Sequence, residues 1–210
     1  MTELNQLMEE KISTIISWVL HPMLIPTYAL LLIFSQDAFF VMILPGKLKL
    51  ILFGLIVANT LLLPLIFIWM MRKRGIITSY QMPYRAERTF PFATTALFYF
   101  ATWIMMNNLG LPGVYYLFVL GGAILIAVAM IINLFWKISI HMVGIGGLTG
   151  GFIGLNYQML INSGPLILIL IFLSGLVGFA RLKQNTHNEA QVYVGFMVGI
   201  AVMSGITVLL

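Results

Sequence analysis

The 210-residue chain has no cysteine and very few charges, with 11 lysines and arginines and 6 acidic residues making up 8% of the sequence. Without cysteine it can form no disulfide, thiolate metal site or cysteine nucleophile. A soluble domain devotes about a quarter of its residues to charged side chains, so this chain could not cover a water-facing surface. Disorder is excluded as well, because 61% of the residues are hydrophobic. We therefore expect an integral membrane protein.

Seven runs with few or no charges are candidate membrane spans, although the third and the sixth are short. They cover residues 12–34, 50–71, 90–106, 114–136, 142–160, 165–180 and 190–210. A spanning helix needs about 20 mostly apolar residues, and the alternating polarity of a membrane β-barrel does not occur. We predict an all-α fold, a polytopic transmembrane helical bundle of about seven spans, with six as the alternative. It forms a single membrane domain over residues 1–210.

The first run follows an acidic stretch, whereas a secretory signal has a basic start, a shorter apolar core and a cleavage site. We therefore interpret it as a retained span. His21-Pro22 and Pro26 predict a kink, because proline removes a hydrogen bond from the helix. His21 is interpreted as a helix-packing residue rather than a site residue.

Basic residues are distributed unequally between the two ends of the predicted bundle. If seven spans alternate in direction, segments 72–89, 137–141 and 181–189 emerge on one side, together with the N-terminus. These segments hold eight of the eleven basic residues: Arg72, Lys73, Arg74, Arg85, Arg88, Lys137, Arg181 and Lys183. Basic loops normally remain in the cytoplasm, but a basic cluster can instead bind an anion. The sequence leaves both explanations open.

Polar groups beside a membrane are costly and are functional candidates by default. Polar side chains lie next to a predicted span in three segments at the basic end of the bundle. The first segment holds Lys137, Ser139 and His141, the second holds Arg181, Lys183 and His187, and the third holds Arg85 and Arg88. Glycines follow both histidines at helical spacing: Gly144, Gly147, Gly151 and Gly154 after His141, and Gly195 and Gly199 after His187, with Gln191 between His187 and Gly195. Such stripes let membrane helices approach closely. We predict that the fifth and seventh spans pack closely and hold both imidazoles at the same end of the bundle. The alternative is that the glycines only allow the helices to pack and the histidines form no site.

This inventory of side chains suits phosphoryl transfer. Arginine binds phosphate oxygens bidentately and stabilises developing charge, while one imidazole can attack phosphorus and a second can protonate the departing oxygen. No GxxxxGK[ST] phosphate-binding loop occurs, and acidic side chains that could hold magnesium are scarce. The residues therefore indicate a metal-independent transfer through phosphohistidine.

The same residues resemble the type-2 phosphatidic acid phosphatase (lipid phosphate phosphatase) superfamily, whose pattern is Kx6RP, then PSGH, then SRx5Hx3D. Ser139 and His141 match the second element, with Ile138 and Ile140 in place of its proline and glycine. Arg181 and His187 match the third element with five residues between them.

The resemblance covers residues 81–199 and is weakest in the first element. Arg88 and Pro91 lie near the expected positions, Gln81 stands where the family has lysine, and Arg85 is a possible substitute. Gln191 stands where the third element has its acid.

The resemblance implies a role for each matched residue. His187 would be the nucleophile and His141 the acid for the leaving group, while Gln191 would orient His187 without supplying the family's negative charge. The phosphate would be held by Arg88, Arg181 and Ser139, joined by Arg85 and Lys137. Glu87 and Glu189 are the carboxylates that could compensate at the acid position.

The expected activity is therefore phosphatase action on an amphiphilic lipid phosphate or diphosphate, without cofactor or metal and without a nucleic-acid partner. The substrate classes are phosphatidic acid, phosphatidylglycerophosphate, isoprenyl diphosphates and lipid A phosphates, with their tails in the bilayer. A catalytically weakened lipid-phosphate-binding protein is the first alternative and a transporter the second. The resemblance implies a bacterial inner (cytoplasmic) membrane with a periplasmic site. The positive-inside rule would instead place the basic end in the cytoplasm. We give the family expectation more weight, because several of these basic residues would bind phosphate.

Overall fold

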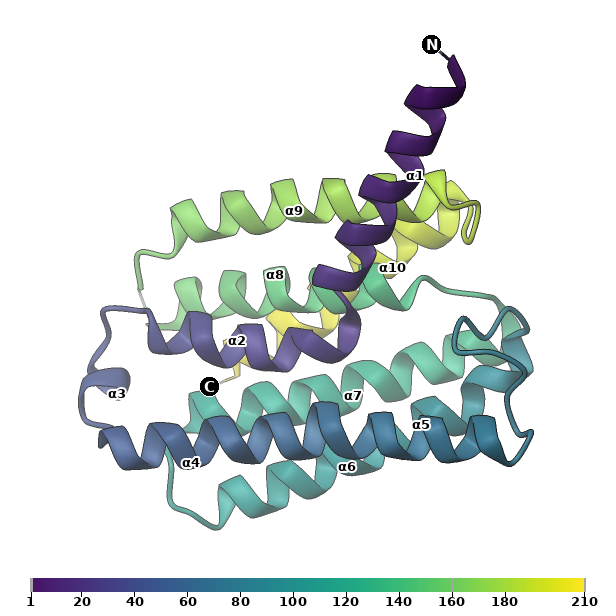
Figure 1. The fold of residues 1–210 in the computed structure, drawn as a ribbon. Coiled ribbons are helices and arrows are strands. Elements are labelled where there is room, and N and C mark those ends of the chain that lie inside the picture. The colour runs from purple at the N-terminus through teal and green to yellow at the C-terminus, as the bar shows by residue number, and fades with distance from the viewer. Residues whose placement is uncertain (1, 160, 210) are drawn as a thin grey trace.

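The computed structural model describes residues 2–159 and 161–209, with side chains from Leu7 onward. The regular secondary structure of these residues consists of helices joined by loops (Figure 1). The α-helices are α1 (Thr2–Val19), α2 (Ile25–Phe34), α3 (Phe39–Met42), α4 (Gly46–Ile56), α5 (Leu63–Lys73), α6 (Thr89–Asn107), α7 (Gly113–Phe135), α8 (Ile140–Met159), α9 (Gly164–Lys183) and α10 (Glu189–Val208). Shorter elements are the 3-10 helices Pro22–Leu24 and Arg85–Arg88 and the π-helix Val57–Leu62, which joins α4 to α5.

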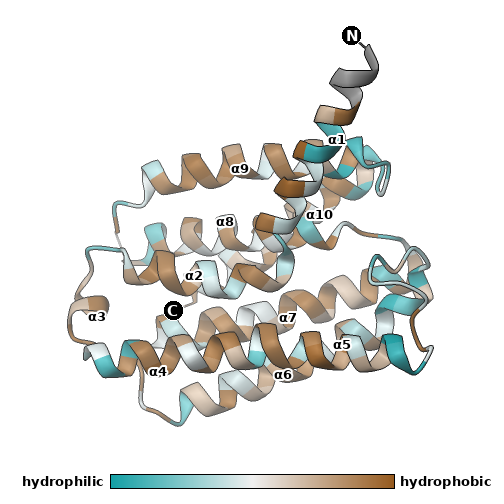
Figure 2. Ribbon diagram, viewed as in Figure 1, coloured by the Kyte–Doolittle hydropathy of each residue, from teal (hydrophilic) through white to brown (hydrophobic). Residues whose placement is uncertain are grey.

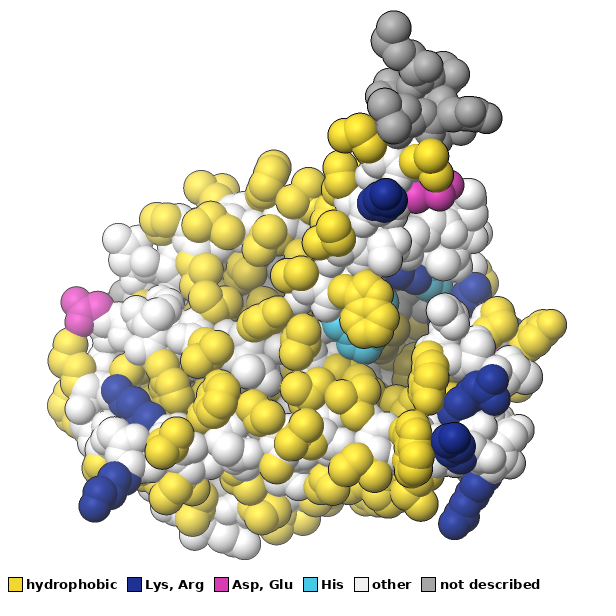
Figure 3. Space-filling model, in the orientation of Figure 1, with side chains coloured by type: hydrophobic (Ala, Val, Ile, Leu, Met, Phe, Trp, Pro, Cys, Tyr) yellow, Lys and Arg dark blue, Asp and Glu magenta, His cyan; other side chains and the backbone are white. Residues whose placement is uncertain are grey.

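Within the described part of the chain, six helical stretches are long and apolar enough to cross a membrane. They are Leu7–Phe34, Gly46–Lys73, Arg85–Asn107, Gly113–Phe135, Gly164–Lys183 and Glu189–Val208. Figure 2 shows hydrophobic residues along the helices and hydrophilic residues gathered in loops at their ends. In Figure 3, a broad band of hydrophobic side chains covers the visible face, and most lysine and arginine side chains lie at the two ends of the bundle. The prediction of a transmembrane helical bundle is confirmed.

The fifth predicted span corresponds to α8, which is outside these six stretches. It has 20 residues, of which twelve are buried, and glycines occur throughout it. Because glycine adds no apolar side chain, α8 is less hydrophobic than the helices around it, and its neighbours cover it on several sides. The fifth span was predicted to end at residue 160 and the seventh at residue 210, and both residues lie outside the described part of the chain.

The first span is broken where a kink was predicted. Helix α1 ends at Val19, the 3-10 helix begins at Pro22, and Pro26 lies in the first turn of α2. The Nδ1 atom of His21 accepts a hydrogen bond from the Met23 backbone at 3.3 Å, which caps the short 3-10 helix. Proline therefore starts two elements here, at positions where its missing N–H costs no helical hydrogen bond.

Helices α8 and α10 pack almost backbone to backbone, as the glycine stripes predict. A Cβ on Gly199 would lie 2.5 Å from the Gly147 nitrogen, and one on Gly195 would lie 2.9 Å from the Ser139 carbonyl oxygen. On α8, however, the face against α10 includes Gly146 and Gly150, whose added Cβ atoms would meet the backbone of α10 at 2.4 and 2.5 Å.

Part of the predicted α8 stripe points elsewhere. A Cβ on Gly144 would meet Ile25 and Pro22, and one on Gly151 would lie 2.2 Å from the Phe118 ring. Glycine occupies more than one face of α8, so spacing alone could not select the face that meets α10. The predicted crossing is correct, but the α8 register assigned to it is wrong in part.

The loops α5–α6, α7–α8 and α9–α10 lie together at one end of the bundle (Figure 1). Hydrogen bonds tie them to one another: the Asn133 amide donates to the Arg85 carbonyl at 3.0 Å, and the Lys137 ammonium donates to the Thr186 carbonyl at 3.0 Å. The three basic segments therefore share one end, as predicted.

Candidate functional site

A cavity of about 1110 Å³ enters the bundle at the basic end. Five of the predicted site residues line it: Arg88, Lys137, His141, Arg181 and His187. They come from five different parts of the chain, namely the start of α6, the α7–α8 connection, α8, the last turn of α9 and the α9–α10 turn. The lining residues include no carboxylate, so the polar part of the cavity is positively charged and suited to an anion.

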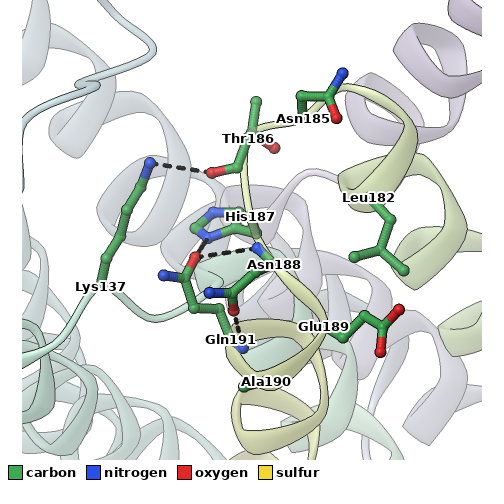
Figure 4. Close-up of a pocket in the computed structure, with 9 residues that line it drawn as sticks. All are labelled: Lys137, Leu182, Asn185, Thr186, His187, Asn188, Glu189, Ala190 and Gln191. Carbon is green, nitrogen blue, oxygen red and sulfur yellow. Dashed lines mark hydrogen bonds between the residues drawn. The ribbon is translucent and has the colours of Figure 1, made fainter.

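His187 is held by the cap of α10 (Figure 4). The Gln191 Oε1 atom lies 2.8 Å from His187 Nδ1 and also accepts a hydrogen bond from the Asn188 backbone at 3.4 Å. In return, the Gln191 N–H donates to Asn188 Oδ1 at 2.9 Å, which completes a capping box. Because Oε1 can only accept, His187 Nδ1 carries the proton and Nε2 keeps its lone pair.

The His187 imidazole is neutral at physiological pH. Burial is the main reason that its pKa falls from 6.5 to about 4, and the charges of Arg88, Arg181 and Lys137 lower it as well. The hydrogen bond to Gln191 acts in the opposite direction. The side chain is 8% exposed, so its unprotonated Nε2 is protected from bulk water but surrounded by cations.

Arg181 lies in the last turn of α9 and joins this helix to α1. One of its terminal nitrogens donates to Ser17 Oγ at 3.3 Å and to Gln184 Oε1 at 2.8 Å. Its Nε is buried without a hydrogen-bond partner. A half-buried guanidinium with a buried, unsatisfied donor is a strong site for an anion, because an oxyanion supplies both charge and acceptor atoms.

Arg88 lies at the junction between the 3-10 helix and α6 and is 8% exposed. Its Nε donates to the Met82 carbonyl at 3.0 Å, and a terminal nitrogen donates to the Ile138 carbonyl at 3.4 Å. Met82 has a φ of 47°, a left-handed conformation that non-glycine residues rarely adopt. The loop thus holds a strained residue whose carbonyl orients an arginine of the cavity.

Lys137 follows α7, and its ammonium contacts the loop that carries His187. Burial lowers the pKa of Lys137, and the nearby charges of Arg88 and Arg181 lower it further. Three cations therefore converge at one end of the cavity. Among the described side chains, the one ion pair joins Lys183 to Glu9 and involves none of these three cations.

His141 faces a second histidine across the cavity. Its Nε2 lies 3.2 Å from the Ser17 carbonyl oxygen, and its ring centroid lies 5.3 Å from that of His21, edge to face. His21 lines the same cavity, together with Ser17. The sequence interpretation assigned His21 to packing. Its position beside Pro22, where the helix is broken and the chain can turn a side chain inward, is the signal that could have identified it.

Ser139 and Arg85 are placed differently from the other predicted residues. Ser139 is fully buried, its hydroxyl has no hydrogen-bond partner, and its N–H donates to the Gln191 carbonyl at 3.3 Å. The Arg85 guanidinium donates to the Phe135 carbonyl at the end of α7. Neither residue lines the cavity. Ser139 instead supports the first turn of α10, and Arg85 ties two loops together.

The carboxylates considered as replacements for the family acid lie apart from the His187 hydrogen bond. Glu87 Oε1 accepts a hydrogen bond from the Thr78 backbone at 3.1 Å. Glu189 belongs to a shallow pocket of about 830 Å³ that also includes His187 and Gln191 (Figure 4), and Gln191 is the side chain bonded to His187 Nδ1.

Among the described residues, no group of three or more histidine or acidic side chains could hold a metal ion. Comparison of the chain with protein-family models, curated proteins and solved structures found no match.

Proposed function

We propose that this protein is a membrane-embedded phosphatase of lipid phosphates or diphosphates that works through a phosphohistidine intermediate. The observation that carries the proposal is His187: a neutral imidazole, held at Nδ1 by Gln191, beside Arg88, Arg181 and Lys137 in a cavity without lining carboxylates. The match to the phosphatidic acid phosphatase pattern supports the same assignment.

In the proposed reaction, His187 Nε2 attacks phosphorus, and the bond between phosphorus and the lipid oxygen breaks. His141 enters the reaction protonated and, with its Nε2–H on the Ser17 carbonyl, gives its Nδ1 proton to that oxygen, which leaves as the lipid alcohol. Water then attacks the phosphorus of phosphohistidine, His141 takes a proton from the water, and inorganic phosphate leaves. The arginines and Lys137 stabilise the charge on the phosphoryl oxygens throughout.

The decisive test is phosphate release from a panel of lipid phosphates in nanodiscs with a metal chelator present. Wild type should release phosphate and His187→Ala should not, while equal release by the two would reject the proposal. The paired variants Arg88→Ala and Arg181→Ala should each lose activity. Arg72→Ala, which removes an exposed arginine from the same end, is the control and should retain it. An acid-labile, alkali-stable phosphoryl label on wild type but not on His187→Ala would identify the intermediate.

A lipid-phosphate-binding protein without turnover is the second candidate, and the amide at Gln191 favours it. An amide accepts the Nδ1 proton but gives the histidine no added basicity. This candidate predicts lipid-phosphate affinity without release. Wild-type affinity in the Arg88→Ala and Arg181→Ala pair would contradict it.

For location, we propose a bacterial cytoplasmic membrane with the cavity on the periplasmic side. Three of the eight basic residues that would otherwise indicate a cytoplasmic end, Arg88, Lys137 and Arg181, line the cavity, where an anion would bind them. A single cysteine in place of Lys73, introduced into this cysteine-free chain, should react with an impermeant maleimide added to intact spheroplasts. Reaction only after lysis would place the site in the cytoplasm.

A further inference from the structure

The cavity that contains His187 changes in character with depth. Arginine, lysine and histidine line its outer part, whereas its inner part runs between α2, α7, α8 and α10. The inner wall includes Ala29, Ile33, Tyr115, Phe118, Val119 and Met203, each at most 8% exposed. We refer to this inner part as the tail chamber.

The tail chamber extends far into the bundle. On α7 its lining runs from Ile126 to Tyr115, about 16 Å at a rise of 1.5 Å per residue. Both residues lie deeper than Phe135, the end of α7 next to the basic loops. A phosphate between Arg88 and Arg181 would therefore leave a long apolar space beyond it.

A space with such walls favours a hydrocarbon occupant. Water needs polar partners that aliphatic and aromatic walls do not supply. Ligand sites usually measure about 300–1,000 Å³ with mostly apolar walls and a few polar groups that fix orientation. The whole cavity, basic end included, measures about 1110 Å³, slightly above this range, and its lysine, arginine and histidine side chains lie at one end.

The cavity also reaches the side of the bundle. Figure 3 shows histidine side chains bordering a hollow on the face crossed by α1. Trp18, Ile25 and Leu65 belong to the lining, and Trp18 is 73% exposed. An amphiphile in the membrane could enter there without passing through water.

We propose that the tail chamber holds the hydrocarbon chain of the lipid phosphate as a single extended tail inside the bundle. This differs from the expectation that the tail remains in the bilayer. For the position of the head group, the inference rests on the proposed function.

The position of the tail can be tested without turnover. The probe is hexadecyl phosphonate with a diazirine at the end of its chain, bound to wild type in nanodiscs and photolysed. We expect labelled peptides from Tyr115 to Val119 on α7 and around Met203, with labelling suppressed by unlabelled hexadecyl phosphonate. Labels confined to lipid-facing side chains, such as Phe172 at 67% exposure, would overturn the proposal.

A matched pair of variants tests the size of the chamber. Ala29→Phe fills part of it, while Ala201→Phe adds the same ring to an exposed position on α10. Ala29→Phe should reduce the preference for hexadecyl over hexyl phosphonate by roughly tenfold, the effect of about two buried methylene groups. Ala201→Phe should leave this preference unchanged. An equal preference in both variants would overturn the proposal. If Ala29→Phe does not fold, the wild-type labelling pattern decides.

The two proposals fail in different ways. Deep labelling by the phosphonate without phosphate release from hexadecyl phosphate would support the tail chamber and reject the phosphatase. Phosphate release with labels only on lipid-facing residues would support the phosphatase and reject the tail chamber.

Discussion

Gln191 uses one amide oxygen for two purposes, since Oε1 accepts from His187 Nδ1 and from the Asn188 N–H. The second bond belongs to the cap of α10, so the helix that carries Gln191 also fixes the orientation of its side chain. Glutamate is the carboxylate that best fits this arrangement, because it has the same length as glutamine and can accept both hydrogen bonds.

We therefore predict that Gln191→Glu raises kcat for lipid phosphate by about tenfold or more, because the analogous carboxylate-to-amide change in a serine protease lowers kcat by about 10⁴. The negative charge would stabilise the protonated imidazole and so raise the pKa of His187. Initial rates of phosphate release test this. Gln184→Glu adds the same charge to the cavity wall beside Arg181 and should give no increase. A rate at or below wild type in Gln191→Glu would show that another group orients His187.

The lowered pKa of His187, about 4, sets the expected pH dependence. His187 acts unprotonated, so we predict that kcat/KM keeps its value as pH falls from 6.5 toward 5 and declines near pH 4. A decline centred near pH 6.5 would mean that the imidazole is not desolvated.

The same group links folding to pH. The unfolded chain binds more protons than the folded one between about pH 4 and 6.5, so stability should fall as pH decreases across that window. The melting temperature of wild type and of His187→Gln, measured from pH 4 to 7, should diverge over this range if His187 contributes in this way.

The packing of α8 against α10 positions both histidines, because His141 begins α8 and His187 precedes α10. Gly199 lies where the two backbones approach closely, and a Cβ there would fall 2.5 Å from both the Gly147 nitrogen and the Val143 carbonyl oxygen. Gly205, on the same helix, has nothing within 4 Å of an added Cβ.

We predict that Gly199→Ala destabilises the protein by about 1–3 kcal/mol through overpacking and lowers activity by separating the histidines. Gly205→Ala makes the same chemical change in open space, so its effect should be neutral or stabilising by up to about 1 kcal/mol. Thermal unfolding in detergent compares the two. Similar melting temperatures would show that α8 and α10 can separate without cost.

The arrangement of the bundle places its two sets of basic residues at opposite ends. Lys73 ends α5 and Lys183 ends α9, both at the cavity end, whereas Lys47 begins the Gly46–Lys73 stretch at the other end. We predict that single cysteines at Lys73 and Lys183 are labelled by an impermeant maleimide from the same side of the membrane. A cysteine at Lys47 should be labelled from the opposite side. The same-side labelling of Lys73 and Lys183 requires that α8 also crosses the membrane, between the fourth and fifth of the six stretches. Labelling of Lys73 and Lys47 from one side would contradict the span Gly46–Lys73.

The sequence predicted correctly what depends on short stretches of chain. The scarcity of charge and the long apolar runs show that the protein lies in a membrane. The prolines at positions 22 and 26 locate the break in the first span. The basic segments share one end because successive spans alternate in direction. It could not predict the α8 register, because glycine lies on more than one face of that helix and only the neighbours determine which face meets α10.

The candidate site divides in the same way. His141, His187, Arg88 and Arg181 were predicted from the motif resemblance and Lys137 from its charge beside a span, and all five line one cavity. The sequence interpretation left His21 out of this site: the neighbouring Pro22 marks a break where a side chain can turn inward, but the approach of His21 to His141 depends on where the broken first span packs. Arg85 has the charge expected of a phosphate ligand, yet it contacts the end of α7. Chemistry and local spacing are properties of the chain alone. Which side chains share a cavity, and how deep its apolar part runs, is decided by the simultaneous packing of helices far apart in the sequence.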